Sequence, residues 1–262
     1  MAKADTYEVF AIRYASLTNR KASENFIGGD PHEAGSDLDY YVWLVRSSAR
    51  TFVIDTGFDA GVGARRGRRM ITPPAQGLAR LGVDVAGAKD VVITHLHYDH
   101  VGHVSDFPAA RLLVQRSEYE FWTGPFAMRG EYGHLHERDD MAYLQRQLAP
   151  GRLQLLDGAF TVAPGITLHH VGGHTQGLQV VRVWTASGHV VLASDASHFY
   201  ENIRDDRPYS IVDHLPSMYR AFDRIRELAD AEELIVPGHD PAVLQRFPAA
   251  TPALAGLAVR VA

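Results

Sequence analysis

The sequence predicts an α/β protein in which two β-sheets pack together between outer helices, a four-layer αβ/βα sandwich. Short runs rich in Val, Ile, Leu and aromatic residues end in Gly, Asp or His, as buried strands do. Helical periodicity appears between some of these runs. With 262 residues, 46% of them hydrophobic, the chain can bury a sizeable core. We therefore expect residues 1–262 to form one domain.

The predicted strands are spread along the whole chain. They cover residues 7–14, 40–45, 51–55, 90–94, 111–115, 166–171, 178–184, 189–195 and 233–237. The first runs follow one another as in hairpins, and the later ones alternate with helices. This order favours two sheets with helices outside them.

Helices and long loops occupy the segments between the strands. Residues 73–82 begin with proline and end with glycine, and residues 216–230 repeat apolar residues at helical spacing, so both predict helices. Residues 18–39 are polar and rich in turn formers, which predicts a long N-terminal loop. Residues 123–150 mix aromatic, charged and His residues, and we expect a helical excursion over one end of the sheets.

Composition excludes several classes of function. The net charge of −5 and the pI near 6.3 give no basic footprint for nucleic acid or an acidic membrane surface. No apolar run approaches the ~20 residues that span a bilayer, and the start of the chain does not have the pattern of a secretory signal. We expect a cytoplasmic protein with a small-molecule partner. Because there is no cysteine, any metal must be held by His, Asp or Glu.

The stretch HLHYDH at residues 95–100 concentrates metal-binding side chains directly after an apolar run. His95 and His97 are two positions apart, so on an extended segment both side chains point the same way. Asp99 and His100 follow in the next turn. One short loop can thus supply two neighbouring metal positions, although chance clustering among the 14 His of the chain is the alternative.

Three further candidate ligands follow predicted strands. They are His174 in GGHTQG, Asp195 at the end of HVVLASD, and His239 in IVPGHD. Loops after strands converge at one edge of a sheet, so these side chains can meet the HLHYDH segment. Together they supply enough nitrogen and oxygen ligands for two metals that share one carboxylate.

HLHYDH, GGHTQG, ASD and PGHD in this order resemble the metallo-β-lactamase superfamily, and the resemblance spans residues 51–240. It implies that His95, His97 and His174 bind one metal. It also implies that Asp99, His100 and His239 bind a second, with Asp195 bridging the two. An all His and carboxylate set suits zinc first, with manganese, cobalt or iron as alternatives.

Asp55 in FVIDTG resembles a position in the early strand and turn of the same superfamily. It is predicted either to accept a hydrogen bond from a ligand imidazole, which orients the ring, or simply to begin a turn before Gly57. Both interpretations stay open at this stage.

The expected chemistry is hydrolysis. Two bridged cations lower the pKa of a water held between them from ~15.7 towards ~7, and the resulting bridging hydroxide attacks an acyl carbon. We expect a metal-dependent hydrolase acting on ester bonds, with Asp99, Asp195 and His198 as its catalytic residues.

Within the superfamily, the chain most resembles the N-acyl homoserine lactonase-like branch, the quorum-quenching lactonases, which suggests a homodimer. True β-lactamases resemble secreted proteins without a bridging Asp. Glyoxalase II carries a further helical domain, and RNase Z-like nucleases carry a basic arm that is not visible here. The cluster RRGRR at residues 65–69 is interpreted as a solvated loop, with contact to an anionic substrate as the alternative.

His198 departs from the pattern of that branch, which commonly has a tyrosine three residues after the bridging Asp, hydrogen-bonded to the lactone carbonyl. An imidazole can replace the phenol as a hydrogen-bond donor or general acid. An ordinary polar loop histidine is the alternative, and Tyr200 is a second candidate for the donor.

The substrate is therefore expected to be an N-acyl homoserine lactone or a related lactone. Esters, thioesters and cyclic amides are alternatives on the same site. A mononuclear iron persulfide dioxygenase and a metal-stabilised binding module are less favoured. The aromatic residues Phe26, Trp122, Phe126 and Tyr132 either wall an acyl pocket or pack in the core.

Overall fold

Two β-sheets carry the fold, which a computed structural model describes for residues 6–130 and 132–262. The larger sheet has the order β13-β1-β2-β3-β5-β6-β7, with β4 paired to β1, and the smaller has the order β12-β11-β10-β9-β8. The strands of the larger sheet are β1 (Glu8–Leu17), β2 (Leu38–Arg46), β3 (Thr51–Ile54), β4 (Arg69–Met70), β5 (Asp90–Val92), β6 (Arg111–Gln115), β7 (Leu153–Leu156) and β13 (Ala258–Arg260). Those of the smaller sheet are β8 (Phe160–Ala163), β9 (Ile166–His170), β10 (Gln179–Thr185), β11 (Gly188–Ser194) and β12 (Ile235–Pro237).

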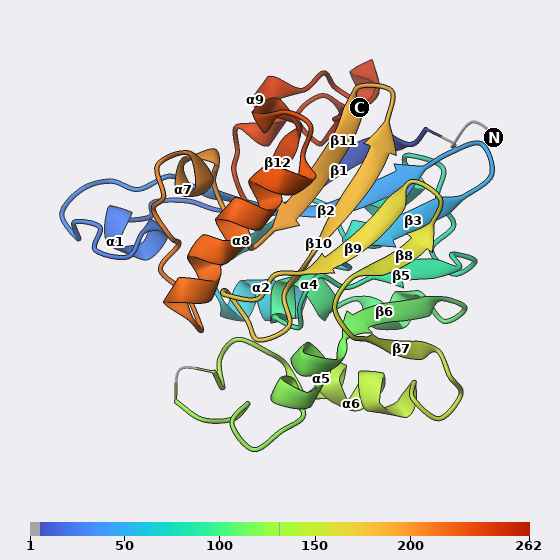
Figure 1. The fold of residues 1–262 in the computed structure, drawn as a ribbon, viewed down its shortest axis with the longest axis horizontal. Coiled ribbons are helices and arrows are strands. Elements are labelled where there is room, and N and C mark those ends of the chain that lie inside the picture. Colours follow the sequence, from blue (N-terminus) through green and yellow to red (C-terminus); the bar gives the residue numbers. More distant parts are fainter. Residues whose placement is uncertain (1–5, 131) are drawn as a thin grey trace.

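Helices lie on the outer faces of the two sheets and around their edges. They are α1 (Ala22–Asn25), α2 (Ala60–Arg65), α3 (Pro74–Ala79), α4 (Tyr98–Val101), α5 (Arg116–Trp122), α6 (Arg138–Arg146), α7 (Tyr200–Arg204), α8 (Leu215–Leu228) and α9 (Val243–Arg246). Figure 1 shows α8 lying over the smaller sheet, while α5 and α6 lie beside β6 and β7. Within the described residues, no helix has the length and apolar character needed to cross a membrane.

Alternation along the strands produces the four layers. In β2, Trp43 faces the core between the two sheets, whereas Val42 and Leu44 face the outer helices. On the other side of the molecule, Phe222 of α8 packs in a third buried cluster with Val191 of β11. Both faces of both sheets are therefore buried, which explains why the strands are nearly continuous apolar runs. The predicted four-layer sandwich is confirmed.

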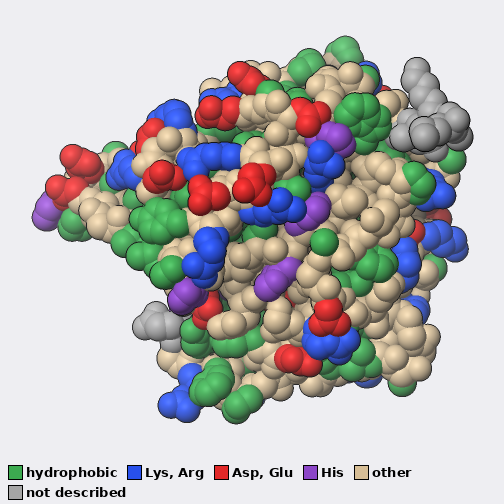
Figure 2. Space-filling model, in the orientation of Figure 1, with side chains coloured by type: hydrophobic (Ala, Val, Ile, Leu, Met, Phe, Trp, Pro, Cys, Tyr) green, Lys and Arg blue, Asp and Glu red, His purple; other side chains and the backbone are tan. Residues whose placement is uncertain are grey.

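The outer surface of α8 is mixed in charge. Figure 2 shows basic and acidic side chains next to one another on this face. Ion pairs within the helix, Arg224 with Glu227 and Arg226 with Asp223, account for part of this pattern.

Each predicted strand is found as a strand, with ends that differ by a few residues, and the two predicted helices correspond to α3 and α8. The sequence did not predict β4, β7, β8 or β13. β7 reads LQLL, without a β-branched residue, and it becomes a strand by pairing in parallel with β6.

Two predicted loop segments need correction. Among the described residues of the helical excursion at 123–150, only α6 is helical, because Gly124, Pro125, Gly130 and Gly133 interrupt the segment before it. The N-terminal loop at 18–39 contains the short helix α1, and β2 already begins at Leu38. Residues 1–5, where the absence of a secretory signal was judged, lie outside the described residues.

Strand direction brings several loops to one edge of the sandwich. In the larger sheet, β3, β5 and β6 run parallel. In the smaller sheet, β9 and β11 are both antiparallel to β10, and β12 is parallel to β11, so these three also share a direction. The loops after β5, β9, β11 and β12 carry every predicted ligand, and the loop after β3 carries Asp55.

Candidate metal centre

The first group of candidate ligands surrounds one oxygen of Asp195. His95 and His97 come from the turn after β5, and His174 comes from the loop after β9. Asp195 Oδ2 lies 3.2 Å from His174 Nε2 and 3.7 Å from His95 Nε2. His97 Nδ1 lies 3.0 Å from His174 Nε2. All four residues are buried, and their ligand atoms lie within 4.8 Å of one another.

The second group surrounds the other oxygen of the same carboxylate. Asp195 Oδ1 lies 3.2 Å from His100 Nε2 and 3.1 Å from His239 Nε2. Asp99 Oδ2 lies 3.7 Å from His100 Nε2 and 3.9 Å from His239 Nε2. Asp195 thus stands between two groups and turns one oxygen to each.

The donor set fits two metal ions. Two ligands on one tetrahedral zinc, each about 2.0–2.1 Å from the ion, lie about 3.3 Å apart. The separations above are close to this value. The Nε2 atoms of His95 and His100 are buried without a hydrogen-bond partner, and one cation in each group would satisfy both.

Electrostatics keeps His95, His97 and Asp195 in the protonation states that bind metals. Burial lowers the pKa of His95 and His97 well below the usual value, so their imidazoles are neutral. Burial by itself would raise the pKa of Asp195, but the adjoining His198 and His239 hold the pKa of that carboxyl well below its usual range. A carboxylate among neutral imidazoles is the state that a divalent cation requires. His100 differs: although burial lowers its pKa, Asp195 and Asp55 raise it well above the usual value, so this ring must release a proton when a metal binds.

Asp55 orients one of the candidate ligands. Its Oδ2 lies 2.7 Å from His100 Nδ1, so the ring turns Nε2 toward Asp195. Thr94 fixes Asp55 in turn, because its backbone N–H and its hydroxyl donate to the two carboxylate oxygens at 2.7 and 2.8 Å. The prediction that Asp55 accepts from an imidazole of this group is confirmed, and a role limited to starting the turn is wrong.

Asp55→Asn is expected to weaken metal binding at the His100 side by about 10–100-fold, the range for partners that orient a ligand. The amide has one acceptor oxygen, so its NH2 group would face either the Thr94 backbone N–H or His100 Nδ1, which now lie at different carboxylate oxygens. Competition with a chromogenic chelator would measure the affinity. Asp59→Asn is the control, because exposed Asp59 caps α2 outside the site. Equal affinities in the two variants would contradict this role.

The sequence did not reveal Glu118 of α5, which ties two ligand loops together. Its buried carboxylate accepts from Leu96 N at 2.8 Å, from Gly177 N at 2.7 Å and from Trp122 Nε1 at 2.7 Å. Leu96 stands between His95 and His97, and Gly177 follows His174 in the same loop. A single buried carboxylate therefore holds both loops of the first group.

His198 lies inside the site. Its Nε2 is 3.0 Å from Asp195 Oδ2, and its ring stacks on Tyr209 with centroids 3.5 Å apart. Burial lowers the pKa of His198 to about 3, so the ring is neutral. This position beside Asp195 favours a role in the site over that of an ordinary loop histidine. Tyr200, the second candidate, packs instead in the core between the sheets, with Arg246 over its ring.

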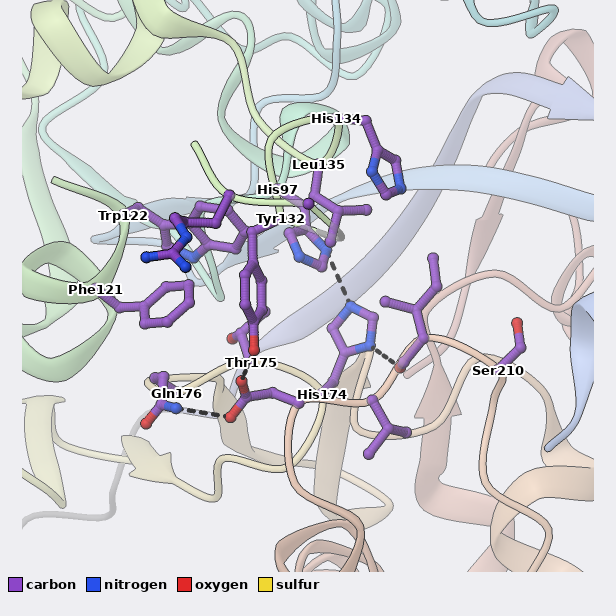
Figure 3. Close-up of a pocket in the computed structure, with 15 residues that line it drawn as sticks. His97, Phe121, Trp122, Tyr132, His134, Leu135, His174, Thr175, Gln176 and Ser210 are labelled. Carbon is purple, nitrogen blue, oxygen red and sulfur yellow. Dashed lines mark hydrogen bonds between the residues drawn. The ribbon is translucent and has the colours of Figure 1, made fainter. Parts of the chain in front are cut away.

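Two adjoining cavities open at this centre. The smaller, about 100 Å³, is lined by the candidate ligands Asp99, Asp195 and His239 and by His198. The larger, about 550 Å³, has an aromatic wall made by Phe121, Trp122 and Tyr132. Figure 3 shows His97 and His174 at the boundary of the larger cavity, where their rings are hydrogen-bonded.

Only part of the predicted aromatic pocket is present. Trp122 and Tyr132 line the larger cavity. Phe126 is 55% exposed, and Phe26 packs against Phe199 away from it.

The interpretation of residues 65–69 as a solvated loop is wrong for two of the arginines. Arg65 and Arg69 are exposed, but Arg66 and Arg68 line the smaller cavity with the candidate ligands. α2 ends at Arg65 and the two-residue strand β4 begins at Arg69, so the chain turns back here and carries both side chains to the site.

Comparisons with known proteins agree with this arrangement. Residues 35–239 match the family described as the metallo-beta-lactamase superfamily. The chain is 31% identical over 166 residues to an N-acyl homoserine lactonase of Bacillus sp, which covers 62% of this chain and 60% of that protein. It is also 31% identical over 169 residues to the N-acyl homoserine lactonase AttM of Azorhizobium caulinodans. This match covers 62% of this chain and 61% of that protein. The matches thus span about three fifths of these curated relatives.

Solved structures share the fold over most of both chains. A quorum-quenching N-acyl homoserine lactone lactonase has a TM-score of 0.75 at 23% identity, covering 92% of this chain and 95% of that one. An N-acyl homoserine lactone hydrolase with the product N-hexanoyl-L-homoserine bound at its catalytic metal centre has a TM-score of 0.75 at 21% identity. The match covers 94% of this chain and 98% of that one.

Proposed function

The chain belongs to the metallo-β-lactamase superfamily, and from this premise we propose that it is a dinuclear metal-dependent hydrolase that opens lactone rings. One observation carries the proposal: Asp195 turns one oxygen to each of two His-rich groups. The lactonase relatives support the lactone as the bond that is broken. Zinc as the metal, a cytoplasmic location and a homodimer stay predictions from the sequence.

In the proposed site, His95, His97 and His174 hold one ion, and Asp99, His100 and His239 hold the other. Asp195 bridges the two. When bound, the ions supply an activated water and polarise the acyl carbonyl. The reaction consumes one water, breaks the acyl C–O bond, and yields a hydroxy carboxylate and one proton.

The protein's own residues position the lactone. His198 Nε2 lies 3.0 Å from Asp195 Oδ2 in the smaller cavity. Once that oxygen binds a metal, the single N–H of the neutral ring is released to donate to the carbonyl oxygen or to the departing alkoxide. Stacking on Tyr209 fixes the orientation of this ring. The larger cavity beside His97 and His174 gives room for a substituent, with Trp122 and Tyr132 as its apolar surface.

His198→Ala is expected to lower kcat by roughly a hundred- to a thousandfold, the usual cost of losing one oxyanion donor, with a small change in KM. His198 also lies with Asp195 and His239 in a third group of candidate ligand atoms, so metal content that stays unchanged in the Ala variant distinguishes the proposed donor from a ligand. Stopped-flow kinetics and metal analysis would measure the two quantities. His198→Tyr should retain more activity than the Ala variant, and His103→Ala is the control. Loss of a metal from the Ala variant would contradict the donor role.

The function itself is tested by proton release in a pH-stat. The substrates are γ- and δ-lactones, including acyl homoserine lactones, with matched open-chain esters, thioesters and cyclic amides. Preferred turnover of lactones supports the proposal. Turnover of another acyl bond alone would keep the metal-dependent hydrolysis and replace the substrate class. Oxygen uptake with one iron per chain would replace the reaction, although the complete second group of ligands favours two ions.

A further inference from the structure

Arg68 brings an unpaired positive charge to the smaller cavity. Its Nε donates to the hydroxyls of Tyr98 and Tyr40, at 3.0 and 3.2 Å, and its Nη1 donates to the carbonyl oxygen of Arg66. Arg68 Nη2 donates to none of the described residues. Two phenols and a carbonyl thus orient the guanidinium without neutralising it.

Arg66 provides an internal contrast. It lines the same cavity, but its Nη2 lies 2.7 Å from Glu137 Oε1, so that charge is paired. Arg68 has no ion-pair partner among the described residues. The negative charge of Asp99 acts on the Arg68 guanidinium without forming an ion pair with it. Asp99 is also a proposed metal ligand. In the metal-loaded protein its charge is already shared with a cation, which leaves Arg68 without compensation.

The support of Arg68 leads directly to the second group of ligands. Tyr98 precedes Asp99 in α4, and the Tyr40 ring lies 5.0 Å from the His239 ring. The guanidinium is therefore held against the wall of the cavity beside Asp99 and His239. The larger cavity adjoins the centre at His97 and His174, which belong to the other group. A substrate at the centre meets aromatic surface on one side and a guanidinium on the other.

The charge balance of the loaded site favours an anion. The charges of two divalent cations are balanced by the carboxylates of Asp99, Asp195 and Asp55 and by the hydroxide that the reaction requires, so the guanidinium of Arg68 supplies a net positive charge. A half-buried guanidinium stabilises a carboxylate through charge-assisted hydrogen bonds.

We propose that Arg68 binds a carboxylate group on the substrate, so that this enzyme acts on carboxylated lactones in preference to neutral ones. This inference rests on the proposed lactone hydrolysis and names the substrate class. The small volume, about 100 Å³, suits a carboxylate directly on or next to the lactone ring.

The test compares a matched substrate pair, γ-butyrolactone-γ-carboxylate and its γ-carboxamide, on wild type, Arg68→Gln and Arg68→Lys. Wild type should prefer the acid by at least roughly tenfold in kcat/KM, and Arg68→Gln should lose roughly ten- to a hundredfold on the acid, mainly in KM. Turnover of the amide should stay nearly constant. Arg68→Lys should recover part of the preference, and exposed Arg69→Gln should keep all of it.

A binding measurement separates this inference from the proposed function. Calorimetry of the zinc-loaded protein with tetrahydrofuran carboxylate, which has no acyl ring bond to hydrolyse, should show binding that is at least roughly tenfold tighter in wild type than in Arg68→Gln. That difference in binding supports the anion site even if no lactone is opened. Absence of lactone turnover would then overturn only the proposed function. No acid preference in wild type, or equal losses on acid and amide in Arg68→Gln, would overturn the anion site.

Discussion

Asp195→Asn is expected to leave about one metal per chain and to lower kcat/KM by at least a hundredfold. The loss should exceed the 10–100-fold effect of removing a partner that only orients a ligand, because Asp195 touches both groups directly. The amide keeps a single oxygen acceptor, whereas the carboxylate turns Oδ1 to His100 and His239 and Oδ2 to His174. The amide also lacks the negative charge that offsets two cations.

Metal analysis after dialysis would measure the expected loss, with initial rates on the lactone that wild type turns over best. Asp205→Asn is the matched control, because Asp205 is exposed and forms an ion pair with Arg204 near the surface. Circular dichroism would show whether both variants keep the fold. Two retained metals together with wild-type rates would remove Asp195 from the bridging position.

The proposed ligands could be predicted because each depends on local sequence. HLHYDH is one continuous segment, and His174, Asp195 and His239 each follow an apolar run that is a strand in the structure. Strand direction then places the ends together. In the larger sheet β3, β5 and β6 are parallel and separated by helices, whereas in the smaller sheet β9 and β11 share a direction because both are antiparallel to β10. This part of the site needs no knowledge of side-chain contacts.

The residues that support and complement these ligands could not be predicted in the same way. Glu118 is one acidic residue in the segment RSEYEFW, and nothing local distinguishes it from exposed Glu120. Arg68 lies in a basic cluster that is typical of a solvated loop, and only the turn between α2 and β4 brings it to the cavity. The same limitation explains β7, whose strand conformation depends on pairing with β6.

Glu118→Ala is expected to produce the largest loss of stability, about 3–5 kcal/mol in the free energy of unfolding. The substitution leaves the N–H groups of Leu96, Gly177 and Trp122 without their acceptor, and each buried unsatisfied donor costs about 1–3 kcal/mol. A loss of this size lies at the upper end for single substitutions. Urea unfolding followed by far-UV circular dichroism would measure it.

The metal dependence of that loss separates two roles of Glu118. If the carboxylate holds the loops of His97 and His174 in their binding positions, Glu118→Ala should gain less stability from added zinc than wild type, because ligand binding stabilises the fold only as far as affinity is retained. Glu118→Gln should fall between the two, since its amide keeps one acceptor oxygen. Glu120→Ala in the same helix is the control and should match wild type. An equal gain from zinc in Glu118→Ala and wild type would limit Glu118 to packing of the core.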